Sequence, residues 1–233
     1  METSPLIEAC KSGDLQEIKA SLKDGADINA VSATGSTPLI YAAQNNQPEA
    51  VELLLKKGAS VNEKNKIGGT ALNRAAENGN IKMMKLLFDN GAEIGPLALI
   101  LASREGQLDA VKLLIEKGAD VNATQHWGQT ALMFAAKEGN LEIVRFLISS
   151  GADVKIKDKN GYTALNHAVE NEQSDVAVVL RSAGATESRA KKRQPAPPPL
   201  NDDHDDDDNG DDTDEVDLGS DDDDIADEDQ SEK

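Results

Sequence analysis

The chain has 233 residues, of which 29% are charged, and its formal net charge is −19. Its single cysteine, Cys10, excludes an internal disulfide framework and a cluster of cysteine metal ligands. No apolar stretch reaches the length of about 18 residues that a membrane-spanning helix needs, and the first residues do not read as a signal peptide. We therefore expect a protein of the cytoplasm or the nucleus, with Cys10 as a small buried residue.

The negative charge lies mostly at one end of the chain. Residues 190–233 carry a net charge of −15, whereas residues 1–189 carry only −4. Aromatic residues make up only 3% of the chain, although large rings dominate the burial of most cores. This composition favours thin layers of short helices that pack through alanine and branched aliphatic residues.

A Gly-Ala dipeptide recurs through residues 1–188, at intervals of 33, 33, 27, 33 and 33. Its glycines are Gly25, Gly58, Gly91, Gly118, Gly151 and Gly184. About ten residues after four of these dipeptides comes a second sequence pattern, which reads GSTPLIYAA, GGTALNRAA, GQTALMFAA and GYTALNHAV. A period of this length predicts a stack of about six repeated units, each of which contacts only its neighbours.

Residues 35–60 show how one unit is expected to fold. Thr37 is suited to cap a first helix, and Pro38 is suited to its first position. A second helix is expected to end at Gly58, which is suited to the left-handed conformation that follows a helix. The two apolar stripes would consist of Leu39, Ala42 and Ala43, and of Val51, Leu54 and Leu55. Residues 60–67 are short and polar, which predicts a turn that projects from the stack.

The spacing and wording of these units resemble the ankyrin repeat, over about residues 1–188. The resemblance implies an all-α solenoid of paired antiparallel helices with β-hairpin fingers, in which the first and last repeats act as caps. The usual histidine of the Thr-Pro-Leu-His phrase is replaced, so we expect its hydrogen bonds to the loop to be absent or replaced. The residues at this position are Ile7, Ile40, Asn73, Ile100, Met133 and Asn166.

The third interval, from Gly91 to Gly118, is shorter than the others and indicates that about six residues are missing between Glu93 and Ala98. We expect a shortened hairpin near residues 94–97, with Leu97 in place of the capping threonine. One interpretation is a tolerated loop deletion. The other is a notch in the row of fingers, through which a partner reaches the helices behind.

The resemblance also implies a binding surface on the concave face, formed by the fingers and the first helix of each repeat. Carried over position by position, it consists of Lys66, Ile67, Glu77, Asn78, His126, Trp127, Gln129, Lys137, Glu138, Lys159, Asn160, Tyr162, Glu170 and Asn171. Trp127 is the first candidate because tryptophan is enriched in binding hot spots. The alternative is that Trp127 packs against its own hairpin or fills the notch.

Lysines alternate along two of the expected fingers. They are Lys64 and Lys66 on one finger, and Lys155, Lys157 and Lys159 on another. Alternating residues of an extended segment share one side, so these lysines form either solvated tips or a basic strip. Such a strip would meet an acidic partner or the acidic end of this chain.

The asparagines of the VN phrase, Asn29, Asn62 and Asn122, are expected to fix the loop that follows each second helix.

Beyond the repeats, residues 189–200 read as a basic and proline-rich linker, and residues 201–233 as a disordered Asp-rich segment. The basic cluster at 189–193 is a candidate nuclear import signal. A partial match to a calcium-binding loop lacks its final glutamate, because Val216 takes that position. Ser220, which precedes Asp221–Asp224, is a candidate phosphorylation site for an acid-directed kinase.

No glycine-rich phosphate loop, nucleophile motif or spaced metal ligands occur in the sequence. We therefore predict a non-enzymatic protein-interaction module, monomeric, without cofactor or metal, that binds neither nucleic acid nor membranes. A more specific alternative is an acidic escort for a basic client, such as a ribosomal protein or a histone. Another is an effector that acts inside a host cell.

Overall fold

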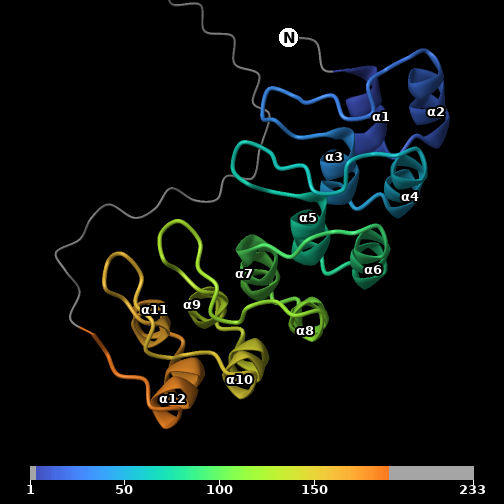
Figure 1. The fold of residues 1–233 in the computed structure, drawn as a ribbon. Coiled ribbons are helices and arrows are strands. Elements are labelled where there is room, and N and C mark those ends of the chain that lie inside the picture. The colour runs from blue at the N-terminus through green and yellow to red at the C-terminus, as the bar shows by residue number, and fades with distance from the viewer. Residues whose placement is uncertain (1–3, 189–233) are drawn as a thin grey trace, which may run out of the picture. The chain divides into compact units, whose positions relative to one another are not determined.

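A computed structural model describes residues 4–188, which form twelve α-helices in six antiparallel pairs (Figure 1). Each repeat consists of an odd-numbered helix and the even-numbered helix that follows it. The helices are α1 (Pro5–Ser12), α2 (Leu15–Lys23), α3 (Pro38–Gln44), α4 (Pro48–Lys56), α5 (Ala71–Glu77), α6 (Ile81–Asp89), α7 (Pro96–Arg104), α8 (Leu108–Glu116), α9 (Ala131–Lys137), α10 (Leu141–Ser149), α11 (Ala164–Glu170) and α12 (Ser174–Ser182).

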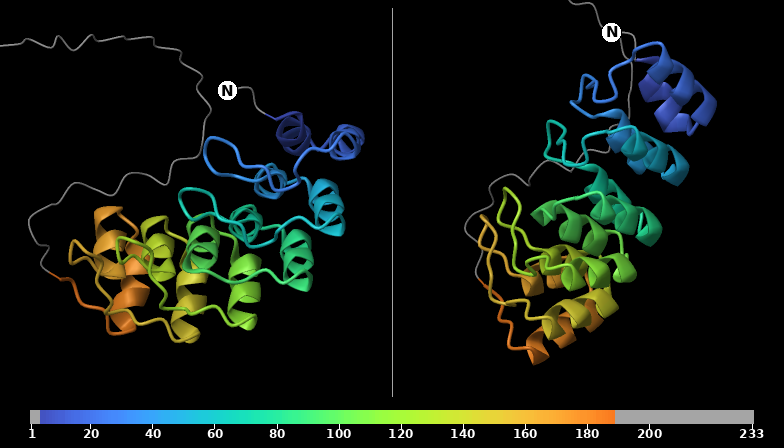
Figure 2. Two further views of the ribbon diagram at one scale, coloured as in Figure 1. Left: turned by 45° about the horizontal axis from the view of Figure 1, so that its top comes forward. Right: turned by 45° about the vertical axis from the view of Figure 1, so that its right-hand side comes forward.

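The odd-numbered helices form one layer of the stack and the even-numbered helices form the other (Figure 2). The substantial contacts between helices are made within a repeat and between consecutive repeats. This arrangement confirms the predicted solenoid, in which each unit covers the apolar side of the next.

The start and the end of each helix follow from local chemistry. The Oγ1 atom of Thr37 accepts a hydrogen bond from the backbone N–H of Ile40 at 3.3 Å, and Pro38 is the first residue of α3. Thr70, Thr130 and Thr163 cap α5, α9 and α11 in the same way. After α4 the chain turns at Gly58, whose φ of +90° suits glycine. These features confirm the start and end predicted for the second repeat.

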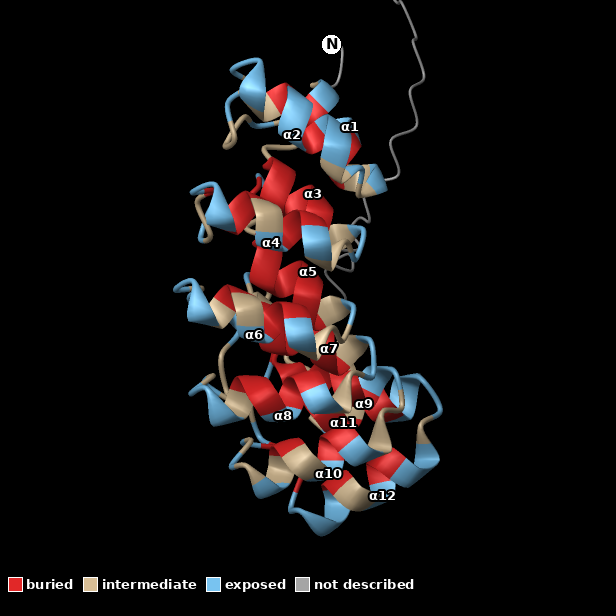
Figure 3. Ribbon diagram, turned by 90° about the vertical axis from the view of Figure 1, so that its right-hand side faces the viewer, coloured by how far each residue is buried: buried red, intermediate tan, exposed pale blue. Residues whose placement is uncertain are grey.

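Small and aliphatic side chains fill the space between the layers. Figure 3 marks in red the buried segments of the helices that carry them. One buried row on the odd-numbered helices consists of Ala9, Ala42, Ala75, Ala102, Ala135 and Ala168. A matching leucine row on the even-numbered helices consists of Leu54, Leu87, Leu114, Leu147 and Leu180. Alanine lets adjacent first helices approach closely, and each leucine removes a larger apolar area from water than an alanine does.

The prediction that Leu97 takes the cap position of α7 was wrong. Gly95 is the N-cap and Pro96 is the first helical residue, so α7 begins two residues earlier in the repeat than α3 does. Proline is well suited to a first helical position because it has no N–H that would need a partner there. The expected shortened hairpin near residues 94–97 is also absent, because residues 90–95 lead directly from α6 to α7 and residues 96 and 97 already belong to α7.

Cys10 is fully buried, as predicted, and burial raises the pKa of its thiol to about 12. An unfolded cysteine ionises at about pH 8.5, so above that pH the thiolate forms only in the unfolded chain. As the pH rises between these two pKa values, we expect the ionisation of Cys10 in the unfolded chain to lower the free energy of unfolding by up to about 1.4 kcal/mol per pH unit. Urea titrations at pH 8 and pH 10 on the chain and on its Cys10→Ala variant measure this difference.

Candidate functional site

Four fingers project from the loops that precede α3, α5, α9 and α11 (Figure 1). They are finger 1 (residues 30–36), finger 2 (63–69), finger 3 (123–129) and finger 4 (156–162). The same two backbone hydrogen bonds close each finger; in finger 2 they run from Asn65 N to Gly69 O and from Gly68 N to Asn65 O, both at 2.9 Å. Within residues 4–188 the fingers form no regular strands, and their one isolated bridge joins Thr124 and Thr130.

The fingers are joined in two pairs. The backbone N–H of Lys66 in finger 2 donates to the carbonyl of Thr34 in finger 1 at 3.0 Å. The backbone N–H of Lys159 in finger 4 donates to the carbonyl of Trp127 in finger 3, also at 3.0 Å. The loop before α7 has no finger, so a gap in the row separates the two pairs (Figure 2).

Two fingers are also fixed to the first helix behind them. The hydroxyl of Tyr41 on α3 lies 3.1 Å from the hydroxyl of Ser32 in finger 1. At the same position of α11, Nε2 of His167 lies 3.1 Å from the buried carboxylate of Asp158 in finger 4. Asp158 also accepts hydrogen bonds from the backbone N–H groups of Asn160 and Tyr162 at 2.9 Å. Finger 4 is therefore held rigidly, which lowers the entropic cost of binding through its tip.

Trp127 lies at the tip of finger 3 between two polar neighbours. Its ring makes an edge-on contact with the ring of His126, with 5.7 Å between the ring centroids. The Nζ atom of Lys159, from finger 4, lies 5.8 Å from the centroid of the Trp127 ring. Trp127 is half-buried, and His126 and Lys159 are exposed. The three predicted residues thus form one cluster across fingers 3 and 4, with an aromatic ring that is still accessible.

The lysines of finger 2, and those of finger 4 together with the residue before it, have no acidic partner within residues 4–188. None of Lys64, Lys66, Lys155, Lys157 and Lys159 is in an ion pair, although all five are exposed. The acidic residues of finger 4 and its loop, Asp158 and Asp153, accept hydrogen bonds from backbone N–H groups. Fingers 2 and 4 therefore present positive charge to solvent, which does not decide between solvated tips and a basic strip.

Glu77, a predicted contact residue, belongs instead to a cluster of charges between α5 and α7. Its carboxylate lies 2.9 Å from the guanidinium of Arg74 and 2.7 Å from that of Arg104. The side chains of Arg74 and Glu77 are only 7% and 15% exposed. The Nε and one Nη atom of Arg74 have no hydrogen-bond partner in the described part of the chain. This cluster acts first on stability, because its charges are largely removed from water.

Other predicted contact residues divide into two groups. Gln129 is 9% exposed and accepts a hydrogen bond from Gln125, and Asn78 donates to the carbonyls of Ala43 and Gln44 at the end of α3. Asn171 donates within its own repeat, to the carbonyl of His167. These three side chains stabilise the scaffold. The remaining predicted residues lie at or near the accessible side of the fingers and first helices; they are Ile67, Lys137, Glu138, Asn160, Tyr162 and Glu170.

The asparagines of the VN phrase link consecutive repeats. The Oδ1 atom of Asn62 accepts a hydrogen bond from the backbone N–H of Glu93 in the next loop at 2.9 Å, and Asn29 and Asn122 bond to Ser60 and Asp153 in the same way. They fix a loop after a second helix, as predicted, but the loop belongs to the following repeat. Gly95 takes this position in the short loop and has no side chain, so the series is interrupted there.

Few polar contacts join the third repeat to the fourth. Within residues 4–188 the only hydrogen bond between these two repeats is the charged one from Arg104 to Glu77, and Nζ of Lys117 lies 5.8 Å from the ring centroid of Phe88. Sequence reasoning missed Arg74 and Arg104 because single arginines on short helices carry no motif. The break itself was visible as the short interval from Gly91 to Gly118.

Among the described residues, no three His, Cys, Asp or Glu side chains are grouped so that they could hold a metal ion. No helix within residues 4–188 is long and apolar enough to span a membrane. The partial calcium-binding loop, the basic cluster at 189–193 and Ser220 all lie outside the described residues, and those predictions stay predictions.

The family model described as ankyrin repeats (3 copies) matches residues 6–98 and 99–190. None of the curated proteins compared with the chain matches it. A solved structure of an ankyrin repeat domain from Acinetobacter baumannii AYE is 33% identical, covers 79% of this chain and 100% of its own, with a TM-score of 0.66. A chain from the complex of a predatory endopeptidase of Bdellovibrio bacteriovorus with an immunity protein is 32% identical. The match covers 78% of this chain and 99% of that one, with a TM-score of 0.69. The human ASB11 ankyrin repeat domain shares the fold at 24% identity. The match covers 80% of this chain and 86% of that one, with a TM-score of 0.71.

Proposed function

Because this chain belongs to the ankyrin-repeat family, whose domains are general protein-interaction modules, we propose that it binds a protein partner on the finger side of the stack and catalyses no reaction. The observation that carries this proposal is the cluster of His126, Trp127 and Lys159, which presents an aromatic ring between polar side chains on two joined fingers. Rigid aromatic anchors with a polar rim are typical of protein interfaces. One similar chain comes from a protein complex, that of an endopeptidase with an immunity protein.

Replacement of Trp127 by alanine tests this function. We expect the affinity for the partner to fall by about thirtyfold, because truncation of a hot-spot aromatic costs about 2 kcal/mol or more. Affinity purification with the full chain supplies the partner, and calorimetric titration of that partner against the variant gives the ratio of dissociation constants.

Val178→Ala is the matched control, because Val178 is an accessible apolar residue that lies away from the fingers, on the second helix of the last repeat. Its affinity for the partner should equal that of the unchanged chain. Equal binding by the Trp127→Ala variant would remove Trp127 from the interface.

A second candidate function follows from charge alone. Residues 201–233 contain 19 Asp or Glu and one Lys, which favours the binding of a basic protein and an escort role. A full chain in which these aspartates are replaced by asparagine is the test. If the partner is a basic client, we expect its affinity to fall and its dependence on salt to disappear, since screening acts on exposed charges. An unchanged salt dependence would exclude this role.

The localisation in cytoplasm or nucleus and the action inside a host cell stay predictions.

A further inference from the structure

The four fingers follow one pattern of hydrogen bonds, and the pattern is incomplete at the gap. In each joined pair, the carbonyl at the tip of one finger accepts a bond from a backbone N–H of the next. The accepting position is held by Thr34 in finger 1 and Trp127 in finger 3. By the repeat spacing, the equivalent acceptor in finger 2 is the carbonyl of Ile67, and the equivalent donor in finger 3 is the N–H of His126.

Both of these backbone groups lack their partner. Within residues 4–188, no hydrogen bond is made by the carbonyl of Ile67 or by the N–H of His126. Both residues are exposed, and the side chain of Ile67 is unusual among the large apolar residues because the residue is 53% exposed. A finger before α7 would supply both partners, but that loop is shorter than the others by the length of such a finger.

The gap has room for an element of about the size of one finger. Fingers 2 and 3 precede α5 and α9, and α7 lies between these two helices (Figure 1). Adjacent helices pack about 8–10 Å apart, so the two fingers are separated by about two such spacings. A hairpin with a hydrogen bond on each side needs three strand spacings of about 4.8 Å. Such a hairpin therefore needs about 14 Å, which a separation of about 16–20 Å accommodates.

The side chains around the gap define the chemistry of such an element. Finger 2 presents Lys64 and Lys66, which have no ion pair in the described part of the chain, beside the exposed Ile67. Finger 3 presents His126 and one accessible side of Trp127. Acidic side chains would complement the lysines, and one apolar side chain would cover Ile67 or the ring of Trp127.

We propose that an acidic hairpin loop of a protein partner inserts between fingers 2 and 3 and takes the place of the missing finger. Its N–H donates to the carbonyl of Ile67, and its carbonyl accepts from the N–H of His126. The inference rests on the proposed function and specifies which part of a partner is recognised. It is a form of strand addition, in which backbone bonds give affinity and the flanking side chains give specificity.

The test uses a display library of disulfide-closed peptide loops, selected on the full chain. The main variant, called the finger-restored variant, replaces Gly95, Pro96 and Leu97 by a copy of residues 29–37, the uncharged sequence of finger 1 and its cap. It lengthens the loop to the usual repeat and adds no charge. Thermal unfolding by circular dichroism checks that it folds. Lys66→Glu is the second variant, and Lys57→Glu is its control, because Lys57 is exposed and lies at the end of α4, away from the fingers.

We expect the selected loops to be rich in Asp and Glu and to bind the finger-restored variant at least about tenfold more weakly, since two backbone hydrogen bonds are lost. Lys66→Glu should weaken binding and Lys57→Glu should not. Suppose the selected loops bind the finger-restored variant as tightly as the unchanged chain but bind the Trp127→Ala variant more weakly. This result would overturn the inference and leave the proposed function intact. Loops that are insensitive to Trp127→Ala, to Lys66→Glu and to the restored finger would contradict both. If the finger-restored variant does not fold, the comparison of Lys66→Glu with Lys57→Glu decides.

Discussion

The Glu77→Ala variant should be about 3–5 kcal/mol less stable than the unchanged chain, the range measured when one partner of a buried ion pair is removed. The carboxylate of Glu77 is the only acidic group that contacts the guanidinium of Arg74 within residues 4–188, at 2.9 Å. Because Arg74 cannot lose its proton, its charge would stay in a site where the side chain is only 7% exposed. The free energy of unfolding in urea measures the loss.

Two further variants separate the buried charge from a general effect of the substitution. The double variant Arg74→Leu with Glu77→Ala should recover most of the stability, because Leu101 occupies the same position of the next first helix and is buried there. Glu138→Ala removes an exposed carboxylate, 3.5 Å from Lys137, and should cost less than about 1 kcal/mol. A loss below about 1 kcal/mol for Glu77→Ala itself would show that the carboxylate does not offset the burial of Arg74.

The repeats could be predicted from the sequence because their signals are local and recur. A capping threonine, a small residue at one position and a glycine after the second helix occur in most copies, and each has the same physical role in the structure. The deficit before α7 was equally visible. The start of α7 was misplaced because the Gly95-Pro96 pair competes with the pattern of the other repeats, and proline at a first position starts the helix earlier.

The candidate site was harder to predict because accessibility depends on contacts between repeats. Sequence positions put Gln129 and Trp127 in one finger, but only Trp127 keeps an accessible side. Glu77 was assigned to binding by its position, whereas two arginines, one of them from the next repeat, engage its carboxylate. Neither arginine belongs to the repeat pattern. Such pairs are invisible until the spacing between two helices is known.

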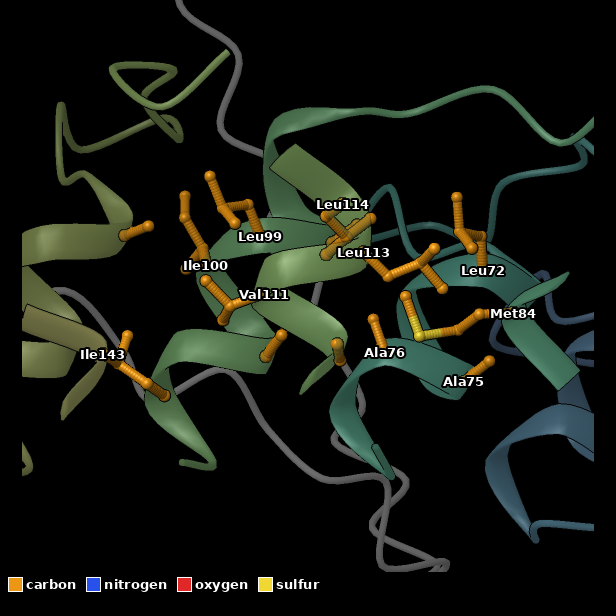
Figure 4. Packing of buried hydrophobic residues seen from close by; sticks show 14 of the residues in the cluster. Leu72, Ala75, Ala76, Met84, Leu99, Ile100, Val111, Leu113, Leu114 and Ile143 are labelled. Carbon is orange, nitrogen blue, oxygen red and sulfur yellow. The ribbon is translucent and has the colours of Figure 1, made fainter. Parts of the chain in front are cut away.

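The apolar packing across the gap is continuous even though the polar links are few. Figure 4 shows Leu72, Ala75, Ala76 and Met84, from α5 and α6, beside Leu99, Leu113 and Leu114, from α7 and α8. The third and fourth repeats are thus held mainly by apolar contact and by the pair of Arg104 with Glu77. Elsewhere in the stack, two finger-to-finger bonds and the bonds accepted by Asn29, Asn62 and Asn122 add to the interfaces, each worth about 1 kcal/mol.

We therefore expect the stack to unfold in two parts that separate at the interface between the third and fourth repeats. Leu180→Ala leaves a cavity in α12, where Leu180 is fully buried, and should destabilise the last three repeats by about 2–5 kcal/mol. Trp127, the only tryptophan, reports on these repeats. Its fluorescence transition should move to lower urea concentration, while about half of the helical circular dichroism persists, because six of the twelve described helices lie before the junction.

Leu54→Ala is the matched control, because Leu54 occupies the same position in α4 and is equally buried. It should shift the circular dichroism of the first three repeats and leave the Trp127 transition nearly in place. The finger-restored variant adds hydrogen bonds that strengthen the interface between the third and fourth repeats. When Leu180→Ala is placed in that variant, the fluorescence transition and the circular dichroism transition should therefore coincide. Coincident transitions without the restored finger would mean that apolar packing of α5 on α7 is sufficient to couple all six repeats, and that the missing finger matters for recognition alone.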